Sequence, residues 1–502
     1  MYCMKNEITI PQTSAERYTF KRLYRETLSH ALFAAIKEVI PEKRVIIGHS
    51  LGDGYYFSCQ DGTVITNEEC EKIKQKLHSL IEDDTKIEAF TLPYREAIEL
   101  LQKENLTDAA SLVRTNALQT VEFNRIKNYI MLNMHNTFTS LGILKAWELR
   151  PYGGKGLLLR YPRSEDLTRI GEWKDNPKLF SVFNEYLTNC RILNLYGVGK
   201  LNDIIMSGNI GDFIETSEAL QRRKIIEVAD MIVKRGTVKC VFVAGPSSSN
   251  KTTFAKRLVL NLKSYGYDPI RFSLDDYYFT KDLVPKDENG EPDLECIEAI
   301  DTALFKEHIG LLLSGKEVHL PNFEFNVGGT GRRTFAEEAT VMRENTILVV
   351  EGLHALNPKI SDVFDKNLIF KIYISALTVL NIDEHTRVRT TDNRIIRRLV
   401  RDSFSRSASA LETLRMWNSV EKGERKYIFP YQNNVDAAIN SAHDYELSVL
   451  KVFAEPLLKG VSPCEEDVYP LAQRLLKMLS LFYPIPSTFV PSDSMLREFI
   501  PQ

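Results

Sequence analysis

Residues 241–258, VFVAGPSSSNKTTFAKRL, constrain the fold more than any other stretch of this 502-residue chain. The apolar run predicts a buried strand, the Gly-Pro-Ser stretch predicts a tight loop, and the residues from Lys251 onward predict a helix. In this setting backbone N–H groups and the positive end of the helix dipole can bind phosphate. Lys251 would reach the β- and γ-phosphate oxygens, and Thr252 would bind Mg²⁺. The alternative is an ordinary helix that begins with a serine-rich N-cap.

One residue of this loop departs from the usual pattern, because Asn250 stands where phosphate loops carry their last glycine. If the position needs a positive φ, asparagine is the least costly replacement, since its short polar side chain tolerates the left-handed conformation. If the position needs close approach of the nucleotide, the extra atoms would collide with the phosphates. We expect a weakened but competent site, and a gain in activity for Asn250→Gly. The expected nucleotide-binding residues are Gly245, Ser247, Ser248, Ser249, Asn250, Lys251, Thr252 and Thr253.

Two further apolar runs end in acidic residues. Asp275 and Asp276 follow the next predicted strand in SLDDYY, and Glu351 follows a third in TILVVEG. Carboxylates at the carboxyl ends of parallel strands lie where such sheets bind ligands. An acid placed there can accept the proton of an attacking hydroxyl and orient the shell of Mg²⁺. A turn, a helix N-cap or a surface position is the alternative for each of them.

Basic residues recur at three- and four-residue steps in TTDNRIIRRLVRDSFSR, so several of them share one helix face. Such an array can neutralise charge on a transferring phosphoryl group and close over the nucleotide as a lid. We assign Arg397 and Arg401 to catalysis, Arg398 to the nucleotide and Arg394 to the substrate, with Arg406 on the stretch that follows. A solvated basic face is the ordinary alternative, and an RNA-contacting stripe is a third.

The order of predicted elements indicates how the chain is divided. Strands alternate with helices from residue 237 onward, which favours a parallel sheet covered by helices on both faces. The first part mixes helices with hairpin signals such as GDG and is typical of an α+β domain. We predict an α+β domain over 1–160, a helical connector over 161–236, an α/β P-loop NTPase domain over 237–465 and a helical tail over 466–502.

Composition excludes some partners. The net charge of -3 creates no general field for nucleic acid or an acidic membrane, and no apolar run approaches the length of a membrane span. Seven scattered cysteines without a CxxC pair are typical of a reducing compartment. We expect a cytoplasmic protein without a membrane partner. A homo-oligomer, and nucleic acid as a ligand of the N-terminal domain, stay open.

Residues 237 to about 460 resemble the uridine kinase and phosphoribulokinase branch of the P-loop kinases. The likeness is carried, in chain order, by GPSSSNKTTFAKRL, SLDDYY, LPNFEF, VVEGLHALNP and DNRIIRRLVRD. It implies transfer of the γ-phosphate of ATP to a nucleoside 5′-hydroxyl with Mg²⁺. Asp275 would be the general base, Lys251 would contact the phosphates, and the metal would lie among Thr252, Asp275 and Glu351.

The same resemblance implies an acceptor pocket. Tyr278 and Phe323 would line the site of the base, and Glu295 falls where uridine kinases place an aspartate on the ribose diol. Gly328 stands near the position of a base-contacting histidine, so the identity of the base stays open. A nucleotide-binding protein without turnover, an RNA-related binding protein, and a kinase for another small hydroxyl compound stay as alternatives.

Residues 10 to about 150 resemble the second additional (editing) domain of threonyl- and alanyl-tRNA synthetases. LYRETLSHALFAAIKEVIP, IGHSLGDGYYFSC and TSLGILKAWEL carry this likeness. That domain edits with an HxxxH pair and a distant Cys/His pair. Here Glu26 takes the first histidine position, His30 keeps the second, and the region of Asn133 and Thr137 is interpreted as lacking the Cys/His pair. The resemblance implies an editing fold that is retained for binding a substrate or partner.

Overall fold

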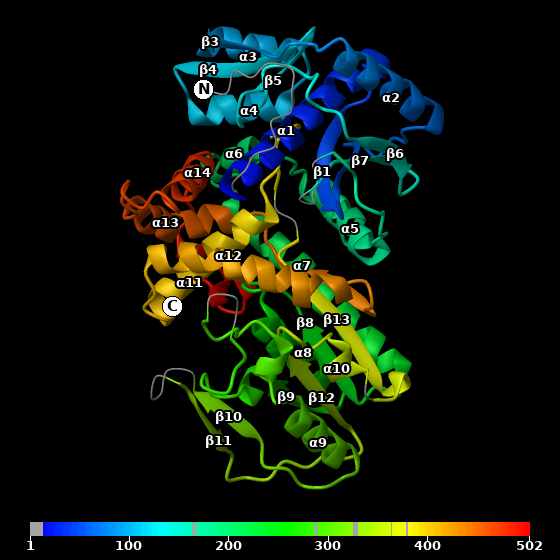
Figure 1. Ribbon diagram of the computed structural model, residues 1–502, viewed down its shortest axis with the longest axis vertical. Coiled ribbons are helices and arrows are strands. Elements are labelled where there is room, and N and C mark those ends of the chain that lie inside the picture. The colour runs from blue at the N-terminus through cyan, green and yellow to red at the C-terminus, as the bar shows by residue number, and fades with distance from the viewer. Residues whose placement is uncertain are drawn as a thin grey trace. The chain divides into compact units, whose positions relative to one another are not determined.

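The computed structural model describes residues 14–162, 166, 168–286, 290–324, 330–362, 364–377 and 380–501 (Figure 1). The chain divides into two compact units. Unit 1 comprises the chain up to Asn209 together with Leu380–Val388, and unit 2 comprises Ile210–Val379 and the chain from Arg389 onward. The predicted connector is therefore shared: its first two helices belong to unit 1 and its last to unit 2.

Unit 1 has the α+β architecture that the sequence predicts. Its two antiparallel sheets have the strand orders β1-β2-β7-β6 and β3-β4-β5. The strands are β1 (Val45–Leu51), β2 (Gly54–Cys59), β3 (Glu88–Pro93), β4 (Thr120–Ile126), β5 (Tyr129–Leu132), β6 (Glu148–Tyr152) and β7 (Gly156–Arg160). The helices are α1 (Ser14–Val39), α2 (Asn67–Glu82), α3 (Tyr94–Lys103), α4 (Thr107–Asn116), α5 (Pro177–Leu193) and α6 (Val198–Met206).

Local sequence explains how several of these elements begin and end. The predicted hairpin forms from β1 and β2, and Gly52 between them has a φ of +51°, which suits glycine. Helix α2 begins with a capping box in which Thr66 accepts from the N–H of Glu69 and the Glu69 side chain accepts from the N–H of Thr66. The buried side chains of α1 and α2 then pack with those of the four-stranded sheet in one apolar core.

The segment Leu380–Val388 belongs to unit 1 although the chain on both sides of it in sequence belongs to unit 2. The Glu384 carboxylate accepts hydrogen bonds from the N–H groups of Asp108 at 2.8 Å and Ala109 at 3.0 Å, at the beginning of α4. It also pairs with Arg44 at 2.6 Å. A carboxylate at this position satisfies helix N–H groups that have no partner within the helix. No sequence pattern predicted this insertion.

Unit 2 is built on a five-stranded sheet in the order β14-β13-β8-β12-β9, and every neighbouring pair is parallel. Figure 1 shows β8 among the sheet strands with α8 beside it. The sheet strands are β8 (Cys240–Ala244), β9 (Asp268–Ser273), β12 (Thr346–Glu351), β13 (Ile369–Ser375) and β14 (Ala437–Asn440), and a separate hairpin joins β10 (Pro321–Glu324) to β11 (Arg332–Phe335). This confirms the predicted parallel α/β fold.

Helices complete unit 2. Apolar side chains of α7 and α8 pack on one face of the sheet in a common core that also takes in Met495 near the carboxyl terminus. The helices are α7 (Ile210–Arg235), α8 (Lys251–Ser264), α9 (Thr302–Leu313), α10 (Pro358–Ser361), α11 (Thr390–Ser405), α12 (Ala410–Tyr427), α13 (Glu446–Lys459) and α14 (Tyr469–Leu479). None of the helices in the described ranges has the length and apolar character that a bilayer crossing needs.

Candidate functional site

The loop between β8 and α8 has the backbone that a phosphate site needs. Two of its residues take a positive φ, 59° at Ser248 and 66° at Asn250. Turns that include left-handed residues can aim successive backbone N–H groups at one anion. Gly245 is required by space, because a Cβ there would lie 1.9 Å from the carbonyl oxygen of Ile374. The loop therefore begins close to β13.

Asn250 has the positive φ that the first of the two sequence interpretations assumes. Its side chain is buried and forms three hydrogen bonds. The amide nitrogen donates to the carbonyl oxygen of Met495 at 2.9 Å and to Glu498 at 3.2 Å. The amide oxygen accepts from Arg397 at 2.8 Å. The side-chain atoms that glycine lacks are therefore engaged by α11 and by the carboxyl-terminal segment.

Lys251 and Thr252 begin α8, beside the end of β12. The Lys251 ammonium donates to the carbonyl oxygen of Pro246 across the loop at 3.1 Å. The Thr252 hydroxyl donates to Glu351 at 2.9 Å. Glu351 is the last residue of β12 and is 4% exposed. Burial and the neighbouring charge of Asp275 raise the pKa of Glu351 to about 7, against the opposing influence of Lys251.

The two aspartates differ in their surroundings. The sequence places them at the end of the strand, but the strand ends at Ser273, and they lie just beyond it in a short 3-10 helix, η1 (Leu274–Tyr277). Asp276 accepts from the backbone N–H of Phe323 at 3.3 Å. Asp275 is exposed to solvent, although enough protein surrounds its carboxylate to raise the pKa, an effect that Lys251 and Arg406 oppose. Asp275 is therefore the more accessible carboxylate at this edge of the sheet.

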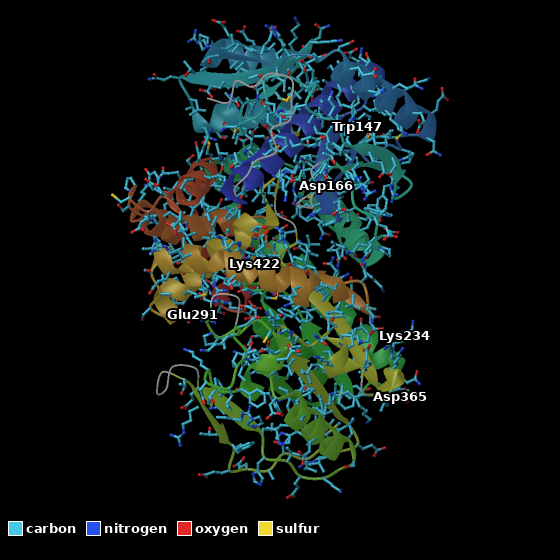
Figure 2. All side chains as sticks on the ribbon, in the orientation of Figure 1. Trp147, Asp166, Lys234, Glu291, Asp365 and Lys422 are labelled. Atoms are coloured by element: carbon cyan, nitrogen blue, oxygen red, sulfur yellow. The ribbon has the colours of Figure 1, made fainter. Side chains whose placement is uncertain are left out.

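Two of the predicted arginines bind the loop from outside. Arg394 donates to the carbonyl oxygen of Ser247 at 2.8 Å and pairs with buried Glu424 of α12. The Glu424 carboxylate also accepts from the N–H of Ser247. Arg397 is 0% exposed, pairs with Glu446 at 2.6 Å and donates to the carbonyl oxygen of Ser248 at 3.2 Å. Their charges are thus neutralised inside the protein, and their contacts fix the loop backbone. Figure 2 labels Lys422, which lies on α12, the helix that also carries Glu424.

The other arginines cluster around Asp402. Arg398 lies 3.2 Å, Arg401 2.7 Å and Arg406 3.6 Å from its carboxylate. Arg398 also donates to the Ser247 hydroxyl at 2.9 Å. The side chain of Arg406 is 57% exposed, the most accessible of the three. Arg406, unlike Arg394 and Arg397, therefore keeps its charge exposed to solvent.

Tyr278 and Phe323, expected at the base, lie close together. Their ring centroids are 6.3 Å apart, both side chains are nearly buried, and the Tyr278 hydroxyl donates to the carbonyl oxygen of Leu294. Glu295 follows in sequence, and burial together with Glu424 raises its pKa to about 7. A Cβ at Gly423 of α12 would lie 2.8 Å from that of Glu295, so α12 approaches this acid closely. Gly328 lies outside the described residues.

Sequence reasoning missed the acidic residues that hold this arrangement together. Glu424 and Glu446 pair with Arg394 and Arg397, and Glu498 accepts from Asn250 and from the Thr253 hydroxyl. All three are far from the loop in sequence and lie on three different elements, α12, α13 and the 3-10 helix over Met495–Glu498. A buried arginine on α11 implies a buried partner, but no spacing rule identifies it.

In unit 1, the second histidine position of the editing resemblance lies in the core. Burial lowers the pKa of His30 to about 4, and a neighbouring imidazole, His135, contributes in the same direction. His385 enters from Leu380–Val388, hydrogen-bonds the Tyr129 hydroxyl, and has a pKa lowered by burial to about 3. Both imidazoles are therefore neutral at pH 7. Neither His135 nor His385 is among the site residues that the sequence predicts.

Comparison with known proteins agrees with this division. Residues 240–448 match the model of the phosphoribulokinase/uridine kinase family. Unit 2 carries a domain of that family. The N-terminal region matches threonine–tRNA ligases, at 28% identity over 154 residues for Acetivibrio thermocellus (30% of this chain, 24% of that enzyme) and 36% over 84 residues for Clostridioides difficile (17% and 13%). The chain thus spans about a quarter or less of these relatives.

Solved structures whose descriptions name kinases are also similar to this chain. A protein described as a possible uridine kinase from Bacillus stearothermophilus is 16% identical, with a TM-score of 0.29, and the match covers 43% of this chain and 98% of that one. D-glycerate 3-kinase from Cryptococcus neoformans is also 16% identical, with a TM-score of 0.25 and coverage of 54% and 90%. Scores this low do not inform the choice of acceptor.

Proposed function

We propose that unit 2 transfers the γ-phosphate of ATP to the 5′-hydroxyl of a uridine-like nucleoside. The observation that supports this most directly is the accessible carboxylate of Asp275 beside Lys251 and the Thr252–Glu351 pair, at the carboxyl ends of β8, β9 and β12. This is the edge where parallel α/β sheets bind ligands. A site without catalytic activity would have no need to retain Lys251, Thr252, Asp275 and Glu351 together.

The residues present fit a magnesium ion that is shared with the nucleotide. The Thr252 hydroxyl and the carboxylates of Glu351 and Asp275 are the hard oxygen donors that Mg²⁺ prefers, and Mg²⁺ commonly takes one or two carboxylates plus phosphate oxygens. Across the described part of the chain, no cluster of three or more His, Cys, Asp or Glu side chains could hold a metal alone. When bound, Mg²⁺ would neutralise charge on the β- and γ-phosphates.

Each side chain then has a distinct task in the proposed reaction. Asp275 accepts the proton of the acceptor hydroxyl as that oxygen bonds to the γ-phosphorus, and the bond from phosphorus to the bridging oxygen breaks to release ADP. Lys251 holds the phosphate oxygens. Arg401 and the exposed Arg406 stabilise the charge that develops on the transferring group. Arg394 and Arg397 act by positioning the loop.

The acceptor pocket is the finer part of the proposal. Tyr278 and Phe323 supply an apolar surface for a base, and Glu295 supplies a carboxylate for a ribose diol. A raised pKa means that Glu295 can hold a proton near neutral pH and donate as well as accept hydrogen bonds. A small hydroxyl compound other than a nucleoside is the competing acceptor, and it would not need the aromatic pair.

An ATP-consumption assay with Mg²⁺ and a panel of nucleosides, sugars and hydroxy acids tests the proposal. We expect turnover with a pyrimidine nucleoside, and a loss of about 10²- to 10⁴-fold for Asp275→Asn, the usual contribution of a general base. Asp276→Asn is the matched control, because its side-chain oxygen can still accept from the N–H of Phe323. Tight ATP binding without turnover on any acceptor would instead identify a nucleotide-binding protein.

For unit 1 we propose a binding role without editing chemistry. Glu26 replaces one histidine of the resemblance, and His30 is 4% exposed. A buried neutral imidazole cannot readily reach a solvent-borne ester. Hydrolysis of threonyl-tRNA or seryl-tRNA by the purified chain at a rate above that of a His30→Gln variant would contradict this proposal.

A further inference from the structure

We propose that Asn250 and Glu498 are positioning residues through which the carboxyl-terminal segment holds the phosphate loop in its binding conformation. This inference rests on the proposed function and concerns the same site. We call residues 491–501 the C-terminal strap. It includes the 3-10 helix η6 (Met495–Glu498), and Figure 1 shows the C label beside α11.

The strap is itself firmly anchored. Leu496, Phe499 and Ile500 are fully buried, and Met495 belongs to the core between the sheet and its covering helices. Arg497 donates to backbone carbonyl oxygens of the preceding turn, including that of Pro491 at 3.2 Å. A segment with this much buried apolar surface can hold another element in place.

The strap contacts the loop through hydrogen bonds to residues on both sides of Lys251. Glu498 accepts from the Asn250 amide at 3.2 Å and from the Thr253 hydroxyl at 2.5 Å. The Asn250 amide also donates to the carbonyl oxygen of Met495 at 2.9 Å. Residues on both sides of the phosphate-binding lysine are therefore tied to the same four-residue stretch of chain, Met495–Glu498. The guanidinium carbon of Arg397 lies over the Phe499 ring, 4.7 Å from the ring centroid, so this residue of the strap also contacts α11.

The chemistry at position 250 is specific to a carboxamide. Its oxygen must face the Arg397 guanidinium, which only donates, and its nitrogen must face two acceptors. Aspartate would lose the donor and bring a second negative charge to Glu498. Glycine would keep the positive φ but lose all three bonds. Asparagine is thus the residue that satisfies the backbone and links α11 to the strap.

Charge gives the strap a second consequence. Glu498 interacts electrostatically with Lys251 and with Arg406, so its carboxylate lies near the cations that would receive a triphosphate. Asn250 and Thr253 hold that carboxylate in a fixed place. We therefore expect Asn250→Gly to weaken nucleotide binding, which reverses the gain expected from the sequence alone.

Calorimetric titration of the full-length chain with Mg·ATP, paired with steady-state kinetics, tests this role. For Asn250→Gly we expect the Kd and the KM for ATP to rise about tenfold, as loss of one or two net hydrogen bonds implies, while kcat at saturating ATP stays near wild type. Glu498→Ala should produce a similar rise without touching the loop backbone. Asp493→Asn is the control: it removes an exposed ion pair between the strap and Arg222 and should leave ATP binding unchanged.

A rescue separates positioning from general destabilisation. Asn250→Asp should weaken binding more than Asn250→Gly, and adding Glu498→Gln should recover part of the loss, because a glutamine amide can donate to the new carboxylate. If the substitutions only destabilised the fold, the thermal midpoint would fall in Asn250→Asp and in the double variant alike, and ATP affinity would not recover in the double variant. Wild-type affinity in Asn250→Gly or in Glu498→Ala overturns the inference and leaves the kinase proposal intact. Absence of Mg·ATP binding by the wild type overturns both.

Discussion

The phosphate loop of unit 2 and the histidine region of unit 1 have each lost a residue that their resemblances call for, with opposite results. In the loop, Asn250 replaces glycine, yet Asp275 and Arg406 stay accessible to solvent around it. In unit 1, Glu26 replaces histidine, and the remaining imidazole of His30 is buried. The lesson is that the surroundings of a substituted residue decide what the substitution does.

The two regions also differ in how they treat charge. Around the loop, buried guanidinium groups are paired with buried carboxylates, as in Arg397 with Glu446. In unit 1, His30 and His385 are buried in their neutral form, with pKa values that burial lowers to about 4 and about 3. Burying a neutral imidazole costs less than burying an unpaired charge. The buried ion pairs keep charged groups around the loop, whereas the neutral imidazoles of unit 1 are part of its core.

Breaking a buried ion pair behind the loop should have the largest effect on stability. Arg397→Met leaves Glu446 buried without its partner, and such losses cost about 3–5 kcal/mol. Arg425→Met is the matched control on α12, since its pair with Glu421 is largely exposed and is worth less than about 1 kcal/mol. Chemical denaturation monitored by fluorescence measures both. Equal midpoints for the two variants would show that burial of the pair contributes nothing.

Acid should destabilise unit 1 through its imidazoles. A histidine whose pKa is lower in the folded state than in the unfolded state binds its proton mainly after unfolding, so stability is lost as the pH falls below about 6.5. Each such group contributes up to about 1.4 kcal/mol per pH unit in that range. We expect the thermal midpoint to fall between pH 7 and pH 5, and His30→Gln to reduce the slope.

The sequence predicts the folds of the two units but not the residues that hold the phosphate loop. The parallel sheet of unit 2, the α+β character of unit 1 and the β1–β2 hairpin follow from apolar periodicity and turn residues, which act locally. The partners of the loop did not follow. Glu424, Glu446 and Glu498 lie on other elements, and the insertion of Leu380–Val388 into unit 1 depends on contacts across more than two hundred residues of chain. Such pairings are set by tertiary packing, which no spacing rule records.

Proton binding by Glu351 provides a test of the proposed Mg·ATP site in unit 2. Its pKa of about 7 means that the carboxylate becomes fully ionised only above neutral pH. Since a metal ion needs the ionised form, affinity for Mg·ATP should rise by up to about tenfold per pH unit below 7 and level off above it. Glu351→Gln should remove this rise. Glu295→Gln, at an acid with a similar pKa but a proposed role at the acceptor, should preserve it in a titration without acceptor.

The smallest expected effect concerns the segment that enters unit 1. Glu384→Gln keeps an oxygen for only one of the two N–H groups that begin α4, because Asp108 donates to Oε1 and Ala109 donates to Oε2, and it removes the charge that pairs with Arg44. It also relieves Asp108, whose pKa is raised to about 6 by burial and by Glu384. Because the two changes oppose each other, we expect a loss of only about 1 kcal/mol, the usual size of a helix-cap substitution. Urea denaturation at pH 7 measures it. A loss as large as that of Arg397→Met would mean that unit 1 also depends on a buried charge network, and the contrast between the two regions would disappear.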